Sequence, residues 1–233
     1  MKNLNIFTIL LLLLMSLLYS GCAQKVAKSI EFPKMYDQKP RSILILPPMN
    51  ESTDAEAKDY YMTTVEMPFA SMGYYTFPVE MVADIMKQEG VYDTELLYKL
   101  SLDKFYEYFG ADAVLFTHIK KWDVSYIVIS SSLTVSIDAN IISTKTGEEL
   151  WKYTGTVVVD LTSKNNATSQ LGLAGLVIDL VATAVNTATA DYVEHAHTAN
   201  QRLISSLPYG PYHEAYLKDQ EAELIDQTPS KSN

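Results

Sequence analysis

Residues 126–142, Tyr-Ile-Val-Ile-Ser-Ser-Ser-Leu-Thr-Val-Ser-Ile-Asp-Ala-Asn-Ile-Ile, carry the pattern that decides the fold. From Leu133 to Ile141 every second side chain is apolar, and the side chains between them are Thr, Ser, Asp and Asn. Successive side chains of a strand point to opposite faces, so this alternation predicts a strand with one buried face and one solvated face.

Two further strands flank this one. We expect the preceding strand at Ala113–Trp122 and the following strand at Glu149–Asp160, after the turn Lys145-Thr-Gly-Glu148. Glycine in a short polar connection is typical of a hairpin. The three segments therefore predict an antiparallel three-stranded meander.

The chain before the meander alternates between short strands and helices. Ser42–Leu46 is an apolar run closed by two prolines, which predicts a strand buried on both faces. Helix and turn signals then predict a helix at Asp54–Met67 that stops near Pro68, with Tyr60, Tyr61, Thr64 and Val65 facing inward. They also predict a strand at Gly73–Phe77, a helix from Pro78 to about Gln88 and a helix at Ser101–Phe109. The predicted fold class is α+β.

The first 22 residues predict a lipoprotein signal. Lys2 is followed by an apolar run, Ile6–Leu18, that is too short for a comfortable membrane span. Ser20 and Gly21 then precede Cys22, the single cysteine of the chain and the residue that we expect to carry lipid. The alternative is an uncleaved anchor helix with an incidental cysteine. Tyr19 departs from the smaller residue that is usual at its position.

These signals divide the chain into five segments. Residues 1–21 are a signal peptide, 22–40 a structureless tether, 41–162 the α+β domain, 163–213 a C-terminal helix with a Pro/Tyr loop, and 214–233 an acidic polar tail. With 18 basic and 28 acidic residues the net charge is −10, which makes nucleic acid an improbable partner.

The sequence offers little for catalysis. His195 and His197 are two residues apart, which places them on different faces of a helix and outside the i, i+4 spacing of zinc ligands. His118 lies within a predicted strand beside two lysines, and His213 lies in a loop where packing or a turn hydrogen bond is its expected role. There is no nucleophile elbow or phosphate-binding loop. We therefore expect no catalytic, metal or cofactor site and no enzyme.

Several short motifs occur in an order that resembles a bacterial lipoprotein family. They are Arg41-Ser-Ile-Leu-Ile-Leu-Pro-Pro48, Gly110-Ala-Asp-Ala-Val-Leu-Phe116, Thr146-Gly-Glu-Glu-Leu-Trp151 and Leu207-Pro-Tyr-Gly-Pro-Tyr-His213. The chain is similar to the family typified by a Neisseria vaccine-candidate lipoprotein, with a fold that resembles the N-terminal domain of TolB and is related in architecture to CsgG and LpoB. The resemblance implies a mixed sheet with flanking helices, and a non-enzymatic envelope component often encoded beside a CsgG-like lipoprotein.

The segment Ser169–Leu207 predicts a long helix, apolar on nearly every side in its first half. We expect it to support a homo-oligomer, most simply a dimer, through Leu173, Leu176, Val177, Leu180 and Val181. Asp179 and the limited length of the apolar run disfavour the rival interpretation of a membrane span. The other alternative is that these side chains only cover the sheet of a monomer.

The chain has 16 tyrosines, several of them in pairs or clusters. Tyr60-Tyr61, Tyr74-Tyr75, Tyr106 and Tyr108 could form a partner surface, because phenol rings combine apolar area with a polar tip. Half-buried helix and strand positions are the preferred interpretation.

Two function classes remain open. The first is a lipid-anchored interaction protein that assembles with other envelope proteins in secretion, transport or cell-wall regulation. The second is a periplasmic binding module or enzyme that acts on cell-wall or lipid material and needs a pocket with convergent polar groups. Ala23 and Gln24 follow Cys22, and neither is the Asp that would signal retention in the inner membrane. We therefore expect the protein to be anchored in the outer membrane with its domain facing the periplasm. Exposure at the cell surface stays open as an alternative.

Overall fold

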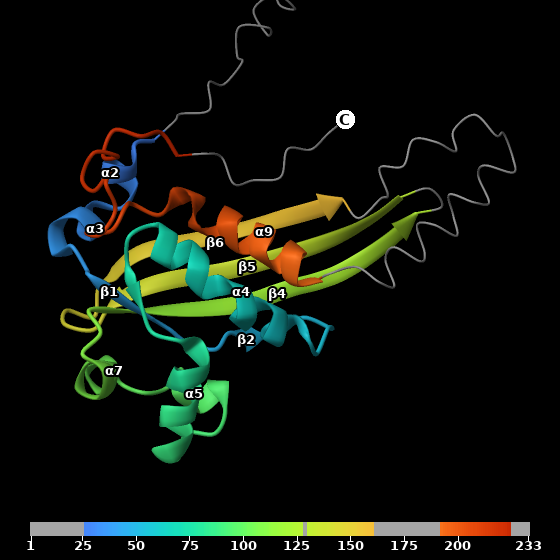
Figure 1. The fold of residues 1–233 in the computed structure, drawn as a ribbon, viewed down its shortest axis with the longest axis horizontal. Helices are drawn as coiled ribbons and strands as arrows, with labels where there is room; N and C mark the ends of the chain where they lie inside the picture. Colours follow the sequence, from blue (N-terminus) through green and yellow to red (C-terminus); the bar gives the residue numbers. More distant parts are fainter. Residues whose placement is uncertain (1–25, 128–129, 161–191, 225–233) are drawn as a thin grey trace, which may run out of the picture.

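The computed structural model describes residues 26–127, 130–160 and 192–224 (Figure 1). Six strands form one mixed sheet in the order β3-β1-β4-β5-β6, with β2 paired to β4 beside this path. The strands are β1 (Ser42–Ile45), β2 (Met49–Asn50), β3 (Tyr75–Thr76), β4 (Ala113–Ile127), β5 (Ser130–Ser143) and β6 (Glu149–Asp160). The predicted α+β class and mixed sheet are confirmed, while a specific likeness to TolB stays a prediction.

The antiparallel meander is present as β4, β5 and β6. The apolar series from Leu133 to Ile141 is buried at every second position, as the alternation predicts. The predicted end of the first strand at Trp122 is wrong, since β4 continues to Ile127. Tyr126 and Ile127, which the sequence pattern assigns to the next strand, belong to β4, and a register shift between Ile119 and Lys121 lies within this strand.

Strand β1 lies between β3 and β4 and runs parallel to both. Its residues Ile43, Leu44 and Ile45 have no exposed surface. A strand that is covered on both faces and paired on both edges must be apolar throughout. The prediction of a doubly buried strand is therefore confirmed.

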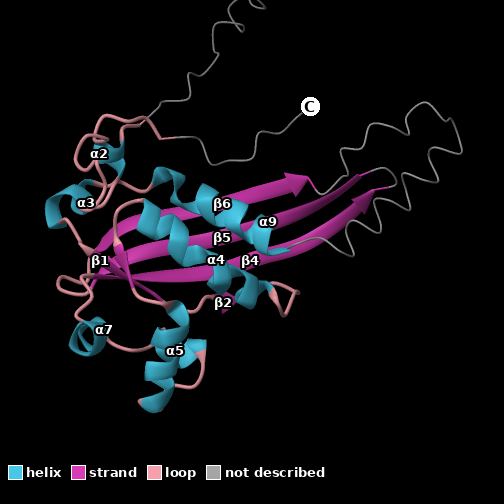
Figure 2. Ribbon diagram, in the orientation of Figure 1, coloured by secondary structure: helices cyan, strands magenta, loops and turns pink. Residues whose placement is uncertain are grey.

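Helices cover both faces of the sheet (Figure 2). They are α2 (Lys28–Glu31), α3 (Pro33–Gln38), α4 (Ala57–Ser71), α5 (Val79–Gln88), α6 (Thr94–Leu97), α7 (Leu102–Phe109), α9 (Tyr192–Leu203) and the short 3₁₀ helix η1 (Ile204–Ser206). One apolar core, which includes Tyr61, Trp122 and Trp151, lies beneath α4 and α9, and a second, which includes Leu44, Met86 and Phe105, lies beneath α5 to α7.

The predicted stop of the first long helix near Pro68 is wrong. Helix α4 continues through Pro68 to Ser71. Pro68 and Phe69 are both buried, so their packing offsets the backbone hydrogen bond that a proline inside a helix cannot donate. Of the predicted inner stripe, Tyr61, Thr64 and Val65 are buried and Tyr60 is half-buried.

Described parts of the predicted tether at residues 22–40 and of the predicted tail at residues 214–233 pack against the folded domain. Helices α2 and α3 occupy residues 28–38, and Phe32 and Met35 are part of the core. Asp219 is buried as well. Both segments are held by contacts with distant parts of the chain, which local sequence patterns do not show.

The C-terminal helix is described only from Tyr192, as α9. It packs beside α4, where the buried amide of Asn200 donates to the hydroxyl of Thr64 at 2.8 Å. Residues 161–191, which include the five apolar positions predicted for self-association, lie outside the described residues. Within the described ranges, no helix has the length and apolar character needed to cross a membrane.

Candidate functional site

The candidate lipidation and self-association residues lie outside the described part of the structure, whereas the histidines and tyrosines singled out in the sequence lie within it. Cys22 and the segment from Leu173 to Val181 lie outside it. His213 accepts a hydrogen bond from the backbone of Ala215 and stacks on Tyr209, which confirms the packing role expected of it. No group of three or more potential metal ligands occurs among the described residues.

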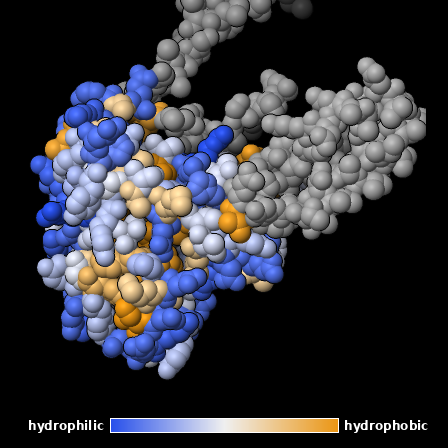
Figure 3. All heavy atoms as spheres, in the orientation of Figure 1, coloured by the Kyte–Doolittle hydropathy of each residue, from blue (hydrophilic) through white to orange (hydrophobic). Residues whose placement is uncertain are grey.

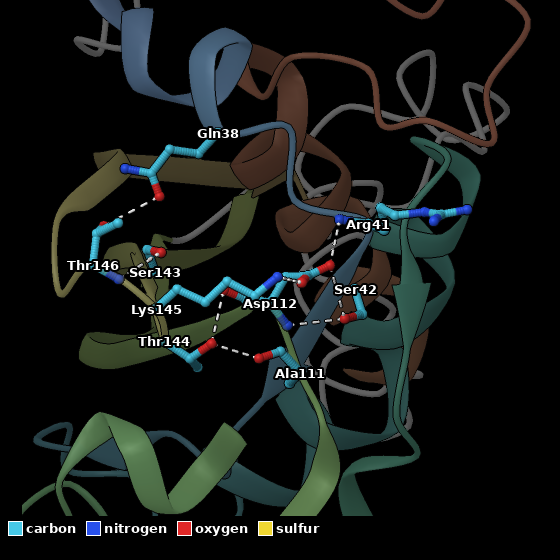
Figure 4. Close-up of polar contacts among 9 residues, drawn as sticks. All are labelled: Gln38, Arg41, Ser42, Ala111, Asp112, Ser143, Thr144, Lys145 and Thr146. Carbon is cyan, nitrogen blue, oxygen red and sulfur yellow. Dashed lines mark hydrogen bonds and ion pairs between the residues drawn. The ribbon is translucent and has the colours of Figure 1, made fainter. Parts of the chain in front are cut away.

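A polar cluster around Asp112 joins β1 to the β5–β6 hairpin (Figure 4). The carboxylate of Asp112 accepts from the backbone N–H of Arg41 at 2.9 Å and from Lys145 Nζ at 2.6 Å. Ser42 Oγ accepts from the backbone N–H of Asp112 at 3.0 Å. Thr144 Oγ1 adds a bond to the carbonyl of Asp112 at 3.0 Å. The guanidinium of Arg41 points away from the cluster.

The electrostatics of this cluster stabilise an ionised Asp112. Partial burial alone would raise the pKa of Asp112, but the hydrogen bonds from Lys145 and from the backbone of Arg41 outweigh it and hold the pKa below its ordinary value. The same bond to Asp112 raises the pKa of Lys145. Because both carboxylate oxygens accept hydrogen bonds from other parts of the chain, the cluster stabilises the contact between β1 and the β5–β6 hairpin.

Helix α3 is fastened to the same hairpin. Gln38 donates to Glu148 at 2.6 Å and accepts from Thr146 at 3.2 Å, and Lys34 forms an ion pair with Glu148 at 3.0 Å. The predicted turn at residues 145–148 is thus confirmed as the hairpin turn, with Gly147 at φ 72°. These bonds hold the segment between α2 and β1 in place.

The N-terminal segment is tied to the last described residues by a buried ion pair. Lys28 Nζ donates to the carbonyl of Leu207 at 2.8 Å and lies 3.4 Å from Asp219 Oδ2, which also accepts from the backbone of Tyr209 at 3.0 Å. Burial lowers the pKa of Lys28, an effect that Asp219 opposes. Burial, together with the charge of Asp219, raises the pKa of Tyr36. We call Lys28, Asp219 and their partners the terminal clamp.

Several pockets lie at the surface of the described residues, and two of them bear on function. One, of about 180 Å³, lies between α4, α5 and α6, where Lys58 Nζ donates to Thr94 Oγ1 at 2.7 Å. Burial lowers the pKa of Lys58. The other, of about 260 Å³, lies beside β6 and is lined by Phe32, Tyr153 and Leu224 among others. Both volumes are below the roughly 300 to 1,000 Å³ typical of small-molecule sites.

The outer edge of β6 is a candidate surface for the addition of a partner strand. Strand β6 is a 12-residue edge strand that pairs with β5. Within the described residues, no backbone hydrogen bond joins its other edge to another segment. Val158 on this strand is 58% exposed. Long edge strands with free backbone groups are natural templates for another strand.

Exposed aromatic residues gather on another part of the surface. Tyr75, Tyr106 and Tyr108 are 40 to 57% exposed, whereas Tyr61 and Tyr74 are buried. The preferred interpretation of the tyrosines as half-buried positions is therefore only partly right. Phe77 contacts both Tyr75 and Phe109 edge to face. Figure 3 shows hydrophobic residues gathered over the region of α5 on an otherwise largely hydrophilic face.

Known proteins similar to this chain are lipoproteins. The family model described as "Putative lipoprotein GNA1162-like" matches residues 30–212. The Neisseria meningitidis serogroup B protein named "Putative lipoprotein NMB1124/NMB1162" is 31% identical over 199 residues, which are 85% of this chain and 89% of that protein.

One solved structure agrees with this relationship. The crystal structure of lipoprotein GNA1162 from Neisseria meningitidis matches with 30% identity and a TM-score of 0.50, over 64% of this chain and 99% of that chain. The C-terminal domain of LpoB from Salmonella enterica matches at 18% identity with a TM-score of 0.35, over 56% of this chain and 95% of that chain, which is too low for a comparison of details. The chain belongs to the GNA1162-like lipoprotein family.

Proposed function

We propose that this protein is a non-enzymatic assembly component of a cell-envelope complex. In this proposal, lipid on Cys22 anchors it to the outer membrane with the domain facing the periplasm. Membership of a lipoprotein family and the signal-like residues before Cys22 support the anchor. Its partners are other envelope proteins in secretion, transport or cell-wall regulation, with a CsgG-like lipoprotein among the candidates.

The outer edge of β6, which has no backbone hydrogen-bond partner among the described residues, is the observation that carries this proposal. A partner strand that pairs with it would extend the sheet through backbone hydrogen bonds. The pocket beside Lys152–Thr154 lies along the same strand and has room for one apolar side chain of the added strand. Specificity would then come from that pocket and affinity from the backbone. Homo-oligomer formation through the segment from Leu173 to Val181 is a separate part of the proposal.

A lysine at Val158 tests the proposal. Charged side chains on an edge strand oppose the addition of another strand, and Val158 is exposed enough to accept one without damage to the core. We expect Val158→Lys to lose the partners that copurify with the wild-type lipoprotein from detergent-solubilised envelopes. A photo-crosslinking residue at exposed Thr154 should form adducts with the same partners.

Leu96→Lys is the matched control, because Leu96 is 47% exposed and lies on α6, away from the edge strand. This variant should keep the partners. The proposal is wrong if Val158→Lys folds, reaches the membrane and still copurifies with every partner of the wild type, or if crosslinks form equally from Leu96 and from Thr154.

A further inference from the structure

The chain that follows Cys22 is part of the folded domain within a few residues. The backbone N–H of Leu224 donates to the carbonyl of Val26 at 2.9 Å, and the N–H groups of Lys28 and Ser29 donate to carbonyls of Ala222 and Gln220, both at 3.0 Å. Ala27 and Glu223 form an antiparallel bridge. Backbone hydrogen bonds to residues 220–224 therefore hold the segment from Val26 to Ser29 on the domain.

Covalent geometry limits how far the domain can move from an anchor on Cys22. Only three residues lie between Cys22 and Val26, so four Cα-to-Cα steps join them. Since an extended chain spans at most about 3.3 to 3.6 Å per residue, Val26 lies within roughly 14 Å of the acylated residue. This is far less than the diameter of a domain of this size, so one particular end of the domain must stay at the lipid surface.

We propose that the surface formed by α2 and residues 209–224 rests directly on the lipid headgroups. We call it the membrane-proximal face. This inference rests on the proposed lipid anchor at Cys22 and adds a fixed orientation to it. In Figure 1, α2 and the chain segment that pairs with it lie together at one end, and α5 lies at another.

The residues of this face suit a neutral lipid interface. Ile30 is 73% exposed and Tyr212 is 62% exposed, and aliphatic and aromatic side chains of this kind are favourable at a headgroup layer. Glu221 and Glu223 are exposed on the same face. Because carboxylates are repelled by anionic lipids, the covalent lipid and the apolar contacts, rather than basic residues, would hold the domain to a zwitterionic surface.

The terminal clamp keeps this orientation fixed. Lys28 and Asp219, the charged pair that joins the two segments of the face, have side chains that are 9% and 5% exposed. Breaking a buried ion pair is costly, so α2 cannot swing away from residues 219–224 without a large loss of stability. The domain would thus be held against the membrane as a rigid body, without a flexible stalk.

Fluorescence quenching by headgroup-labelled lipid tests the inference on the acylated full-length protein. The chain has one cysteine, which the lipid would occupy, so Ile30→Cys introduces a single reactive thiol. After labelling with a small fluorophore and reconstitution in phosphatidylcholine vesicles that contain a headgroup spin label, we expect the probe at residue 30 to lose most of its fluorescence. Tyr212→Cys provides a second probe of the same face.

Tyr92→Cys is the matched control, because Tyr92 is 76% exposed and follows α5. Its probe should keep its fluorescence. Insertion of a 20-residue Gly/Ser spacer, a length of about 70 Å when extended, between Ala23 and Gln24 should restore fluorescence at residue 30 while the protein still floats with the vesicles.

Two failures are distinguishable. A protein that does not float with vesicles contradicts the lipid anchor and therefore the proposed function. A protein that floats, but whose probes at residues 30 and 212 are quenched no more than the probe at residue 92, leaves the anchor intact and overturns the membrane-proximal face.

Discussion

The ammonium group of Lys28 lies 3.4 Å from the carboxylate of Asp219, at the opposite end of the described chain, and both side chains are less than 10% exposed. This pair joins the two segments that local sequence patterns assign to a tether and a tail. Removal of one partner would leave the other charge buried without its counter-ion.

Asp219→Ala should therefore lower the free energy of unfolding by about 3 to 5 kcal/mol, as expected when one partner of a buried pair is removed. Urea denaturation followed by circular dichroism measures this change. Asp84→Ala is the control, since the pair between Asp84 and Lys87 is exposed and should contribute less than about 1 kcal/mol. Equal effects of the two substitutions would contradict a structural role for the clamp.

Gly73 and Gly90 provide a matched pair for a test of backbone contact. Both have positive φ, 85° and 86°, but a Cβ on Gly73 would overlap the backbone of His213, whereas a Cβ on Gly90 would meet open space. Gly90→Ala should lower the free energy of unfolding by about 1 to 2 kcal/mol, because alanine is strained in the left-handed conformation. Gly73→Ala should cost about 1 to 3 kcal/mol more, from overpacking. Thermal unfolding of both variants measures the difference, and equal values would show that the loop at residues 210–213 is not packed on Gly73.

The hydroxyls of Tyr61 and Thr117 lie 2.9 Å apart in the buried contact between α4 and β4. Thr117→Val should destabilise the fold by about 1 to 3 kcal/mol, because the Tyr61 hydroxyl then has no partner. Adding Tyr61→Phe should recover most of the loss, since replacement of both polar groups is nearly neutral. A double-mutant cycle in urea measures the coupling, and additive effects would contradict it.

Asp112 makes stability depend on acid pH. The pKa of Asp112 is lowered from 3.8 in the folded state, so the unfolded chain binds the proton more tightly. The contribution of the ionised Asp112 to the free energy of unfolding is therefore complete above pH 3.8. It is lost as the pH falls through the pKa that Asp112 has in the folded state. Asp112→Asn should destabilise the protein by about 1.5 to 3 kcal/mol at pH 7, as for hydrogen bonds to a charged group.

At pH 3 the difference between the wild type and Asp112→Asn should shrink. Urea midpoints at both pH values measure this change. Asp84→Asn, at an exposed position, serves as the reference for general acid effects. A difference for Asp112→Asn that is the same at pH 7 and pH 3 would contradict the assigned role of the Asp112 carboxylate.

The parts of the fold that local patterns determine could be predicted from the sequence. The series from Leu133 to Ile141 identifies the buried face of β5, because a strand covered on one face needs apolar side chains only at alternate positions. Ser42–Leu46 identifies the central strand for a related reason, since both of its faces are covered. Both predictions depend only on neighbouring residues.

The parts that depend on distant contacts could not be predicted. Helices α2 and α3 have four and six residues, too few to show helical periodicity. Lys28 looks like an ordinary surface lysine in the sequence, and only the fold brings Asp219 to it. Likewise, Asp112 lies within a family motif, but its bond to Lys145 depends on the pairing of β4 with β5.

The bridge between Ala27 and Glu223 also sets an order of events during biosynthesis. A ribosome makes residues 26–38 first, yet their hydrogen-bonding partners at 219–224 come almost 200 residues later. The loop between these two segments cannot close until residues 219–224 have been synthesised. The loss of chain entropy on closing it therefore comes late in folding. The earliest of the described helices to be synthesised are therefore the last to be secured, and nascent chains that stop before Asp219 would leave Phe32 and Met35 available to chaperones and proteases.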